Sequence, residues 1–201
     1  MSDETPSPGE GGALGRTGAA PYELSDYERD ALGEVGNICM SNAAGVLGSL
    51  VGRPVQIAPP NVQPMTDAAL RADCKAPSAV VSVSYTDGLE GSSILVLSVS
   101  DAATMADLMM GGEGAPADTL DEMRSSAVAE AMNQMMGGAS SAMADLIGRE
   151  IHISVPGLEI LDLADQGVGA LGGSGGLLVR ILFPLQVEGL LETTLMQIMP
   201  V

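Results

Sequence analysis

The sequence between Ser25 and Val51 reads SDYERDALGEVGNICMSNAAGVLGSLV, and its apolar positions recur at close to the roughly 3.6-residue period of an amphipathic α-helix. Ser25 and Glu28 have the spacing of a capping box, in which each side chain bonds the backbone N–H of the other residue. Gly52 is a natural helix stop. The pattern therefore predicts a long helix over residues 25–51.

A second stretch of the same kind follows in the other half of the chain. Residues 118–147 are again helical in pattern, with Thr119 and Glu122 as a second capping-box spacing. Strand-like runs, alternating or continuously apolar, lie between and after these stretches. They cover residues 54–58, 79–85, 92–99, 151–155, 177–185 and 190–199, and a short helix is expected over 101–110. The order is helix, three strands, helices, three strands.

The two halves of the chain match each other. A shift of 96 residues aligns Glu34 with Glu130 and Asn37 with Asn133 without a gap. Self-similarity at a fixed spacing indicates a repeated structural unit. We therefore expect an α+β fold in one duplicated domain with a pseudo-two-fold axis. Two long helices would pack on a six-stranded, mostly antiparallel sheet.

Domain boundaries follow from the same pattern. The repeats span residues 25–110 and 118–201, inside one domain of residues 22–201. Residues 1–21 are rich in Gly, Pro, Ser, Thr and acidic residues and have little to bury. Such a segment does not offset its loss of conformational freedom on folding, so a disordered tail is expected there.

The polar residues shared by the two halves form one pattern. It is Asp or Ser, three residues, Glu, two residues, Asn, and then twenty-two residues before a Pro. At roughly 100° per residue these offsets place the three polar side chains within an arc of about 60° on one helix face. The members are Asp30, Glu34, Asn37 and Pro60 in the first half and Ser126, Glu130, Asn133 and Pro156 in the second.

A solvated helix face explains a single Glu-x-x-Asn, but two matched copies need a reason beyond solvation. Asn is about 0.6 kcal/mol worse than Ala in a helix, and neighbouring exposed positions differ between the halves, such as Arg29 against Ser125. An Asn amide both donates and accepts hydrogen bonds and can aim a water molecule, whereas a Glu carboxylate can pair with a partner's Lys. These abilities suit phosphoryl transfer, in which positioning does most of the work.

Composition excludes several other classes of function. The chain has 26 acidic and 8 basic residues, for a formal charge of −18, which argues against a nucleic-acid partner and against an anionic membrane surface. Two Cys and one His provide neither a disulfide framework nor a His-based metal site, so no metal ligands are expected. There is no uncharged apolar run of about 18 residues and no signal-peptide pattern. We expect a cytoplasmic protein that does not insert into a membrane.

Several isolated features have plain structural interpretations. His152 takes the place of Gln56 in the other half and is expected to be an exposed polar residue on a strand. Cys39 is expected to be a buried small hydrophobe rather than a reactive thiol. The glycine motif of residues 167–172 matches a dinucleotide-binding fingerprint, and residues 172–176 match a nucleophile elbow. A strand rather than a helix follows them, so both are set aside.

The doubled pattern resembles the CheC/CheX/FliY family of chemotaxis phosphatases. The resemblance rests on residues 33–38, GEVGNI, and residues 129–136, AEAMNQMM, and covers residues 24–200. Residues 107–113, DLMMGGE, are most similar to the FliY branch, whose members are components of the flagellar motor switch.

The resemblance implies hydrolysis of the aspartyl phosphate on the response regulator CheY. Asn37 and Asn133 would each enter the regulator's site and orient the attacking water. Glu34 and Glu130 would each pair with the regulator's Lys. Mg²⁺ would sit on the regulator, so the chain would need no cofactor of its own. The remaining pattern members would be supporting structure: Asp30, Ser126, Pro60 and Pro156.

The resemblance also implies partners and a location. Phosphorylated CheY is the expected partner, with FliM, FliG, FliN-like proteins or CheD as further candidates, at the cytoplasmic face of the flagellar basal body. FliY-type relatives usually carry a C-terminal FliN-like domain and often begin with an amphipathic peptide, and neither pattern is found in this sequence. A piece of a longer protein and a stand-alone member closer to CheC both remain open. The alternative function is a non-catalytic scaffold domain that binds CheY or belongs to the rotor.

Overall fold

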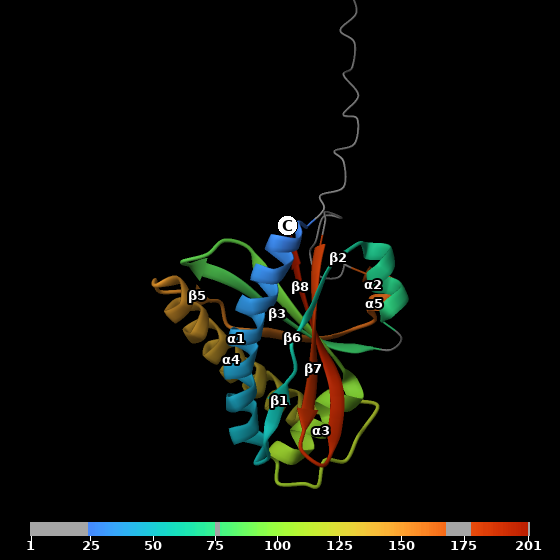
Figure 1. Cartoon of the computed structure of the whole chain (residues 1–201). Helices are drawn as coiled ribbons and strands as arrows, with labels where there is room; N and C mark the ends of the chain where they lie inside the picture. Colours follow the sequence, from blue (N-terminus) through green and yellow to red (C-terminus); the bar gives the residue numbers. More distant parts are fainter. Residues whose placement is uncertain (1–23, 75–76, 168–177, 201) are drawn as a thin grey trace, which may run out of the picture.

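The first long helix forms where the sequence predicts it. The structure is a computed structural model that describes residues 24–74, 77–167 and 178–200, with helix α1 at Asp26–Val51 (Figure 1). Ser25 Oγ accepts a hydrogen bond from the Glu28 N–H at 3.2 Å, and a Glu28 carboxylate oxygen accepts one from the Ser25 N–H at 2.9 Å. The capping box is therefore confirmed. Gly52 ends the helix at φ 67°, a backbone angle that favours glycine. The predicted tail of residues 1–21 lies outside the described residues.

The second long helix begins later than predicted. Helix α4 covers Glu122–Ile147 rather than starting near residue 118. The Thr119–Glu122 capping box is wrong, because Asp121 is the N-cap and its Oδ1 accepts a hydrogen bond from the Arg124 N–H at 2.8 Å. An Asp cap bonds the free N–H groups as well as a Thr does and adds a negative charge at the positive end of the helix.

In the part of the chain that the structure describes, eight strands fill six positions in one antiparallel sheet. The predicted strand count of six is two too low, because the segments that follow Pro60 and Pro156 also form strands. The order is β1-β7-β8-β4-β3-β5, with β2 also paired to β7 and β6 also paired to β3. The strands are β1 (Val55–Ile57), β2 (Asn61–Met65), β3 (Ser78–Asp87), β4 (Ser92–Ser98), β5 (His152–Ile153), β6 (Gly157–Leu161), β7 (Leu178–Val187) and β8 (Leu191–Pro200). The α+β class and the antiparallel sheet are as predicted.

The strand order in the sheet is symmetric between the two halves of the chain, because β1, β7 and β8 on one side match β5, β3 and β4 on the other. Each half runs helix, two short strands, short helix, hairpin: α1-β1-β2-α2-β3-β4 and α4-β5-β6-α5-β7-β8. The short strands of each half pair with the hairpin of the other half, and β4 meets β8 at the centre. A duplication predicts this arrangement, while the repeat boundaries themselves stay a prediction.

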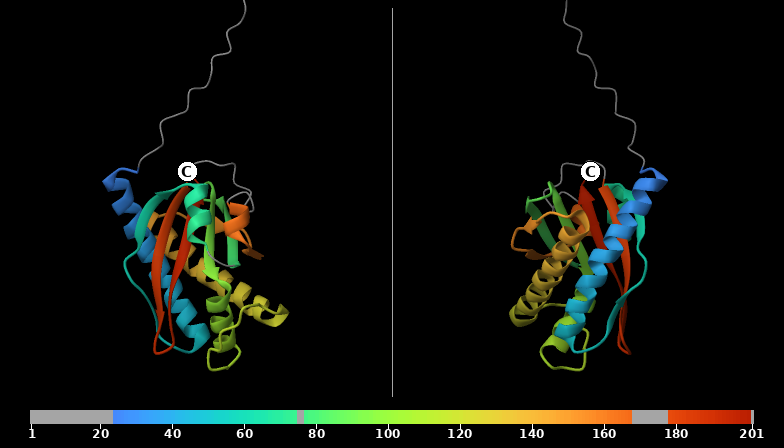
Figure 2. Two further views of the ribbon diagram at one scale, coloured as in Figure 1. Left: turned by 90° about the vertical axis from the view of Figure 1, so that its right-hand side faces the viewer. Right: turned by 60° about the vertical axis from the view of Figure 1, so that its left-hand side comes forward.

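Helices cover both faces of the sheet. Figure 2 shows α1 and α4 on one face and the short helices α2 (Asp67–Asp73) and α5 (Leu163–Gln166) on the other. The larger core lies under α1, α4 and α3 (Val99–Met109), and a smaller core lies under α2 and α5. Strand alternation divides the apolar residues, so that Val81 faces the larger core and Val80 the smaller one. The second helical layer was not predicted from the sequence.

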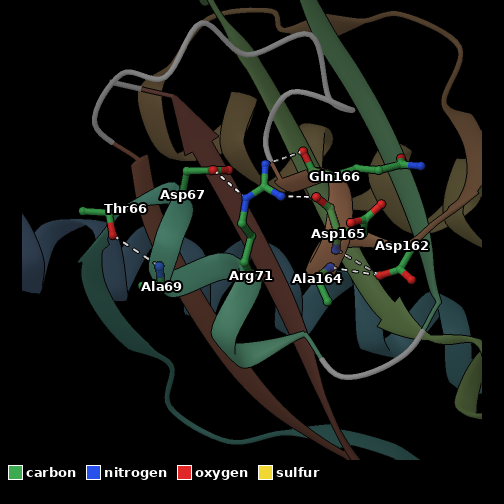
Figure 3. Close-up of polar contacts among 8 residues, drawn as sticks. All are labelled: Thr66, Asp67, Ala69, Arg71, Asp162, Ala164, Asp165 and Gln166. Carbon is green, nitrogen blue, oxygen red and sulfur yellow. Dashed lines mark hydrogen bonds and ion pairs between the residues drawn. The ribbon is translucent and has the colours of Figure 1, made fainter.

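Arg71 connects the two short helices (Figure 3). Its Nε donates to Asp67 Oδ2 at 2.8 Å within α2, and its Nη2 donates to the Gln166 carbonyl of α5, also at 2.8 Å. Its Nη1 donates to the Asp165 carbonyl. These carbonyls end α5 and have no partner within the helix, so Arg71 satisfies them and joins the two halves of the chain.

Candidate functional site

The first polar pattern lies in a groove between α1 and the segment that joins β1 to β2. Asp30, Glu34, Asn37 and Pro60 all line this groove, whose volume is about 530 Å³. Glu34 is exposed and Asn37 is half-buried. The other lining residues are Arg29, Gly33, Pro59, Asn61, Val62 and Gln63. The structure therefore brings the four predicted members of the first half together.

A glycine on the inner side of α1 lets the helix lie close to the sheet. At Gly36 a Cβ would lie 3.2 Å from Cζ of Phe183, the fully buried sole phenylalanine of the chain. At Gly33 a Cβ would lie 3.7 Å from a methyl carbon of Val62 on β2. The tight contact at Gly36 lets β7 approach the helix, whereas the distance at Gly33 is an ordinary van der Waals contact; Glu34 and Asn37 lie on the groove side of the same helix.

The second polar pattern is more open. Ser126, Glu130 and Asn133 are exposed on α4, and Pro156 is half-buried between β5 and β6. Both of these strands contact α4, just as β1 and β2 contact α1. The plan of the second half thus follows that of the first, on a helix of its own.

One local hydrogen bond is present in the second polar pattern and has no counterpart in the first. Gln134 Nε2 donates a hydrogen bond of 2.6 Å to Glu130 Oε1, one turn back along α4. The matched position in the first half is Ile38, which has no hydrogen-bond donor on its side chain. Glu130 is therefore held by its own helix, whereas Glu34 has no such neighbour. This contact was not predicted from the sequence, although side chains four residues apart on a helix are neighbours that can pair.

Residues 107–113 organise the connection into α4. Asp107 Oδ2 accepts hydrogen bonds of 2.9 Å from the N–H groups of both Gly114 and Ala115. The Arg124 guanidinium lies 3.8 Å from the other carboxylate oxygen. The backbone bonds from Ala115 and Gly114 lower the pKa of Asp107 below its usual value. This segment has a structural role, since it fixes the turn before the helix that carries Glu130.

The interpretations of the isolated residues are confirmed where the structure describes them. His152 is exposed, with Nε2 3.6 Å from a Glu150 carboxylate oxygen, and Gln56 is exposed at the matched position. Cys39 is buried, and this burial raises the pKa of its thiol. The glycine motifs fall largely on residues 168–177, outside the described residues.

The described residues contain neither a grouped set of metal ligands nor a membrane-spanning helix. Over residues 24–74, 77–167 and 178–200, no three His, Cys, Asp or Glu side chains are grouped so as to hold a metal ion. Within the same ranges, no helix has the length and apolar character needed to cross a membrane.

Comparison with known proteins assigns the family. The sequence model of the CheC-like family matches residues 28–63 and 123–160, and each range contains one complete polar pattern. The crystal structure of Thermotoga maritima FliY is 39% identical, with a TM-score of 0.81 over 89% of this chain and 92% of that one. The chain belongs to the CheC-like family. Its FliY branch resemblance is also borne out, since the flagellar motor switch phosphatase FliY of Bacillus subtilis (strain 168) is 40% identical over 179 residues.

The matches differ in how much of each protein they cover and in sequence identity. The Bacillus alignment covers 89% of this chain but 47% of the relative, so the chain spans about half the length of that CheC-like protein. A more distant structure, the FliM middle domain from H. pylori, has a TM-score of 0.68 at 13% identity. At that level of identity the match shows a shared CheC-like fold.

Proposed function

We propose that this CheC-like chain is a phosphatase domain that hydrolyses the aspartyl phosphate of a CheY-type response regulator. The groove that gathers Asp30, Glu34, Asn37 and Pro60 carries the proposal, because it presents an amide and a carboxylate together on a rigid helix. The Bacillus relative, which is named as a flagellar motor switch phosphatase, supports it. A location at the cytoplasmic side of the motor switch, with FliM or FliG nearby, is part of the same proposal.

The chemistry asked of Asn37 is to position a water molecule. Its carboxamide oxygen accepts a hydrogen bond from the water while its N–H₂ donates to a phosphoryl oxygen. The water oxygen attacks phosphorus as the bond between phosphorus and the aspartyl oxygen breaks, and that electron pair leaves on the regulator's carboxylate. The water's protons pass to the phosphate product and solvent. Positioning of this kind supplies much of the catalysis in phosphoryl transfer.

Glu34 would fix the partner rather than react. Its exposed carboxylate lies one turn before Asn37 and can form a charge-assisted pair with a Lys of the regulator. That pair would place the phosphoryl group over the Asn37 amide. Mg²⁺ held by the regulator would neutralise charge on the phosphoryl group, and it belongs to the substrate protein. Glu130 and Asn133 would do the same work on α4.

Phosphate release from a phosphorylated CheY-type regulator tests the proposal. We expect partial activity for Asn37→Ala and for Asn133→Ala, and a rate near the regulator's own background for the double variant. Asn42→Ala is the matched control, because Asn42 is an exposed asparagine of α1 that does not line the groove. An unchanged rate in the double variant would overturn the mechanism. Saturable binding without acceleration by the wild type would instead indicate the scaffold function.

A further inference from the structure

Two large apolar side chains stand exposed in the first turns of the two long helices. Tyr27 on α1 is 82% exposed and Met123 on α4 is 70% exposed. Their numbers differ by 123 − 27 = 96, the shift that aligns the two polar patterns. The other large exposed apolar residues in the described part of the chain are Ile38, Met110, Leu146, Ile147, Val155, Ile160 and Leu190. None of these has a partner in that set 96 residues away, so Tyr27 and Met123 are a matched pair.

Each member of the pair lies on the helix face that carries the polar pattern. From Tyr27 the offsets to Asp30, Glu34 and Asn37 are three, seven and ten residues, which at 100° per residue fall within an arc of about 80°. Along the axis Tyr27 is about 10 Å from Glu34 and about 15 Å from Asn37. One side of a standard protein interface, about 800 Å², has a radius of about 16 Å. A partner seated on Glu34 and Asn37 would therefore also cover Tyr27.

Folding gives no reason for this match. Single apolar residues on a surface are common, but an exposed side chain adds little to stability wherever it stands. The start of α1 is fixed by Ser25 and Glu28, and the start of α4 by Asp121, so neither helix needs Tyr27 or Met123 as a cap. The two residues differ in kind, and what recurs is a large apolar side chain at one register beside each polar pattern.

We infer that Tyr27 and Met123 are binding contacts for the phosphorylated regulator, one at each site. This inference rests on the proposed function. The apolar side chain would pack against an apolar patch of the regulator, while the Asn amide ten residues further along the same helix meets the aspartyl phosphate. A Tyr provides a rigid, partly polar ring and a Met an adaptable chain, and both are residue types enriched in interfaces. Their contribution is to affinity, because neither reaches the reacting atoms.

Single-site variants separate the two contacts. Tyr27→Ser is measured in the Asn133→Ala background, in which the first site alone works, and Met123→Ser in the Asn37→Ala background. We expect KM for the phosphorylated regulator to rise about tenfold, equivalent to about 1.4 kcal/mol, with kcat changed less than about twofold. Tyr27→Phe should restore KM, because it keeps the ring. Met110→Ser is the matched control, since Met110 is 43% exposed and lies at the end of α3.

The outcomes distinguish this inference from the proposed function. If the wild type accelerates hydrolysis but both Ser variants keep its KM, the contacts are refuted and the phosphatase stands. If the wild type does not accelerate hydrolysis, the proposed function fails, and Kd for the regulator loaded with beryllofluoride decides the inference. A roughly tenfold weaker Kd in the Ser variants would support it, and an unchanged Kd would refute it. Thermal midpoints equal to those of the backgrounds show that the variants are folded.

Discussion

The hydrogen bond between Gln134 and Glu130 predicts that the second site works below its capacity. Glu130 has to turn from the Gln134 amide to a Lys of the regulator before it can hold that partner. The substitution Gln134→Ile removes the donor and gives α4 the residue that α1 carries at the matched position, Ile38. Both side chains of the pair are exposed, so the substitution opens no cavity in the core.

The size of the effect follows from the strength of this bond. A protein hydrogen bond contributes about 0.5–1.5 kcal/mol net, and one to a charged group in a dry site contributes about twice as much. The bond at 2.6 Å has a charged acceptor but faces water, which places it near 1 kcal/mol. Since 1.4 kcal/mol is a factor of ten, its removal should raise kcat/KM of the second site by about fivefold.

The assay is phosphate release in the Asn37→Ala background, in which the second site alone contributes. The mirror variant, Ile38→Gln in the Asn133→Ala background, should give Glu34 a competing amide and lower kcat/KM of the first site by a similar factor. A Gln134→Ile rate equal to or below that of its background would refute the reasoning, because it would mean that Gln134 holds Glu130 in its working position.

Two further predictions concern stability. Phe183→Ala, which empties the space under Gly36, should lower the free energy of unfolding by about 3–5 kcal/mol in denaturant titrations, whereas Val155→Ala, at 86% exposed, should change it by less than about 0.5 kcal/mol. Asp107 has a lowered pKa in the folded state, so its charged form stabilises the fold above the ordinary carboxyl pKa of 3.8 and loses this effect as the pH falls through the folded value. The gap in Tm between the wild type and Asp107→Asn should therefore be largest near neutral pH and narrow in acid; a gap that stays constant would contradict this.

Local signals in the sequence predicted the long helices, because the residues that start and stop them are neighbours in the chain. Ser25 and Glu28 bond each other and Gly52 ends the helix, and none of this depends on the rest of the fold. The same reasoning failed at Thr119, where Asp121 two residues later offered an equally good cap. Two good capping residues only two positions apart give the same local signal, so the sequence pattern alone does not choose between them.

The missed strands depend on distant partners. The β2 sequence NVQPM contains a Pro. The two residues that it buries, Val62 and Met65, are three positions apart rather than two, so the sequence shows no strand periodicity. It is a strand because β7, more than a hundred residues later, offers it a hydrogen-bonding edge. Pro64 is tolerated there because β2 pairs with β7 alone among the strands that the structure describes. The helix face of the first groove was therefore predictable from the sequence, whereas the β2 strand that forms its opposite wall was not.

This pairing also explains why the two halves are needed together. The first groove is built from α1 and from Pro59–Gln63 of the same half, but β2 is held in place by β7 of the other half. The second site has the same dependence, because β6 follows Pro156 and pairs with β3 of the first half. Each polar pattern thus sits on its own helix beside strands anchored by the opposite half. A single repeat would keep its Glu and Asn but lose the anchored wall beside them, so the duplicated unit, and not the repeat, is the smallest body that can present either site.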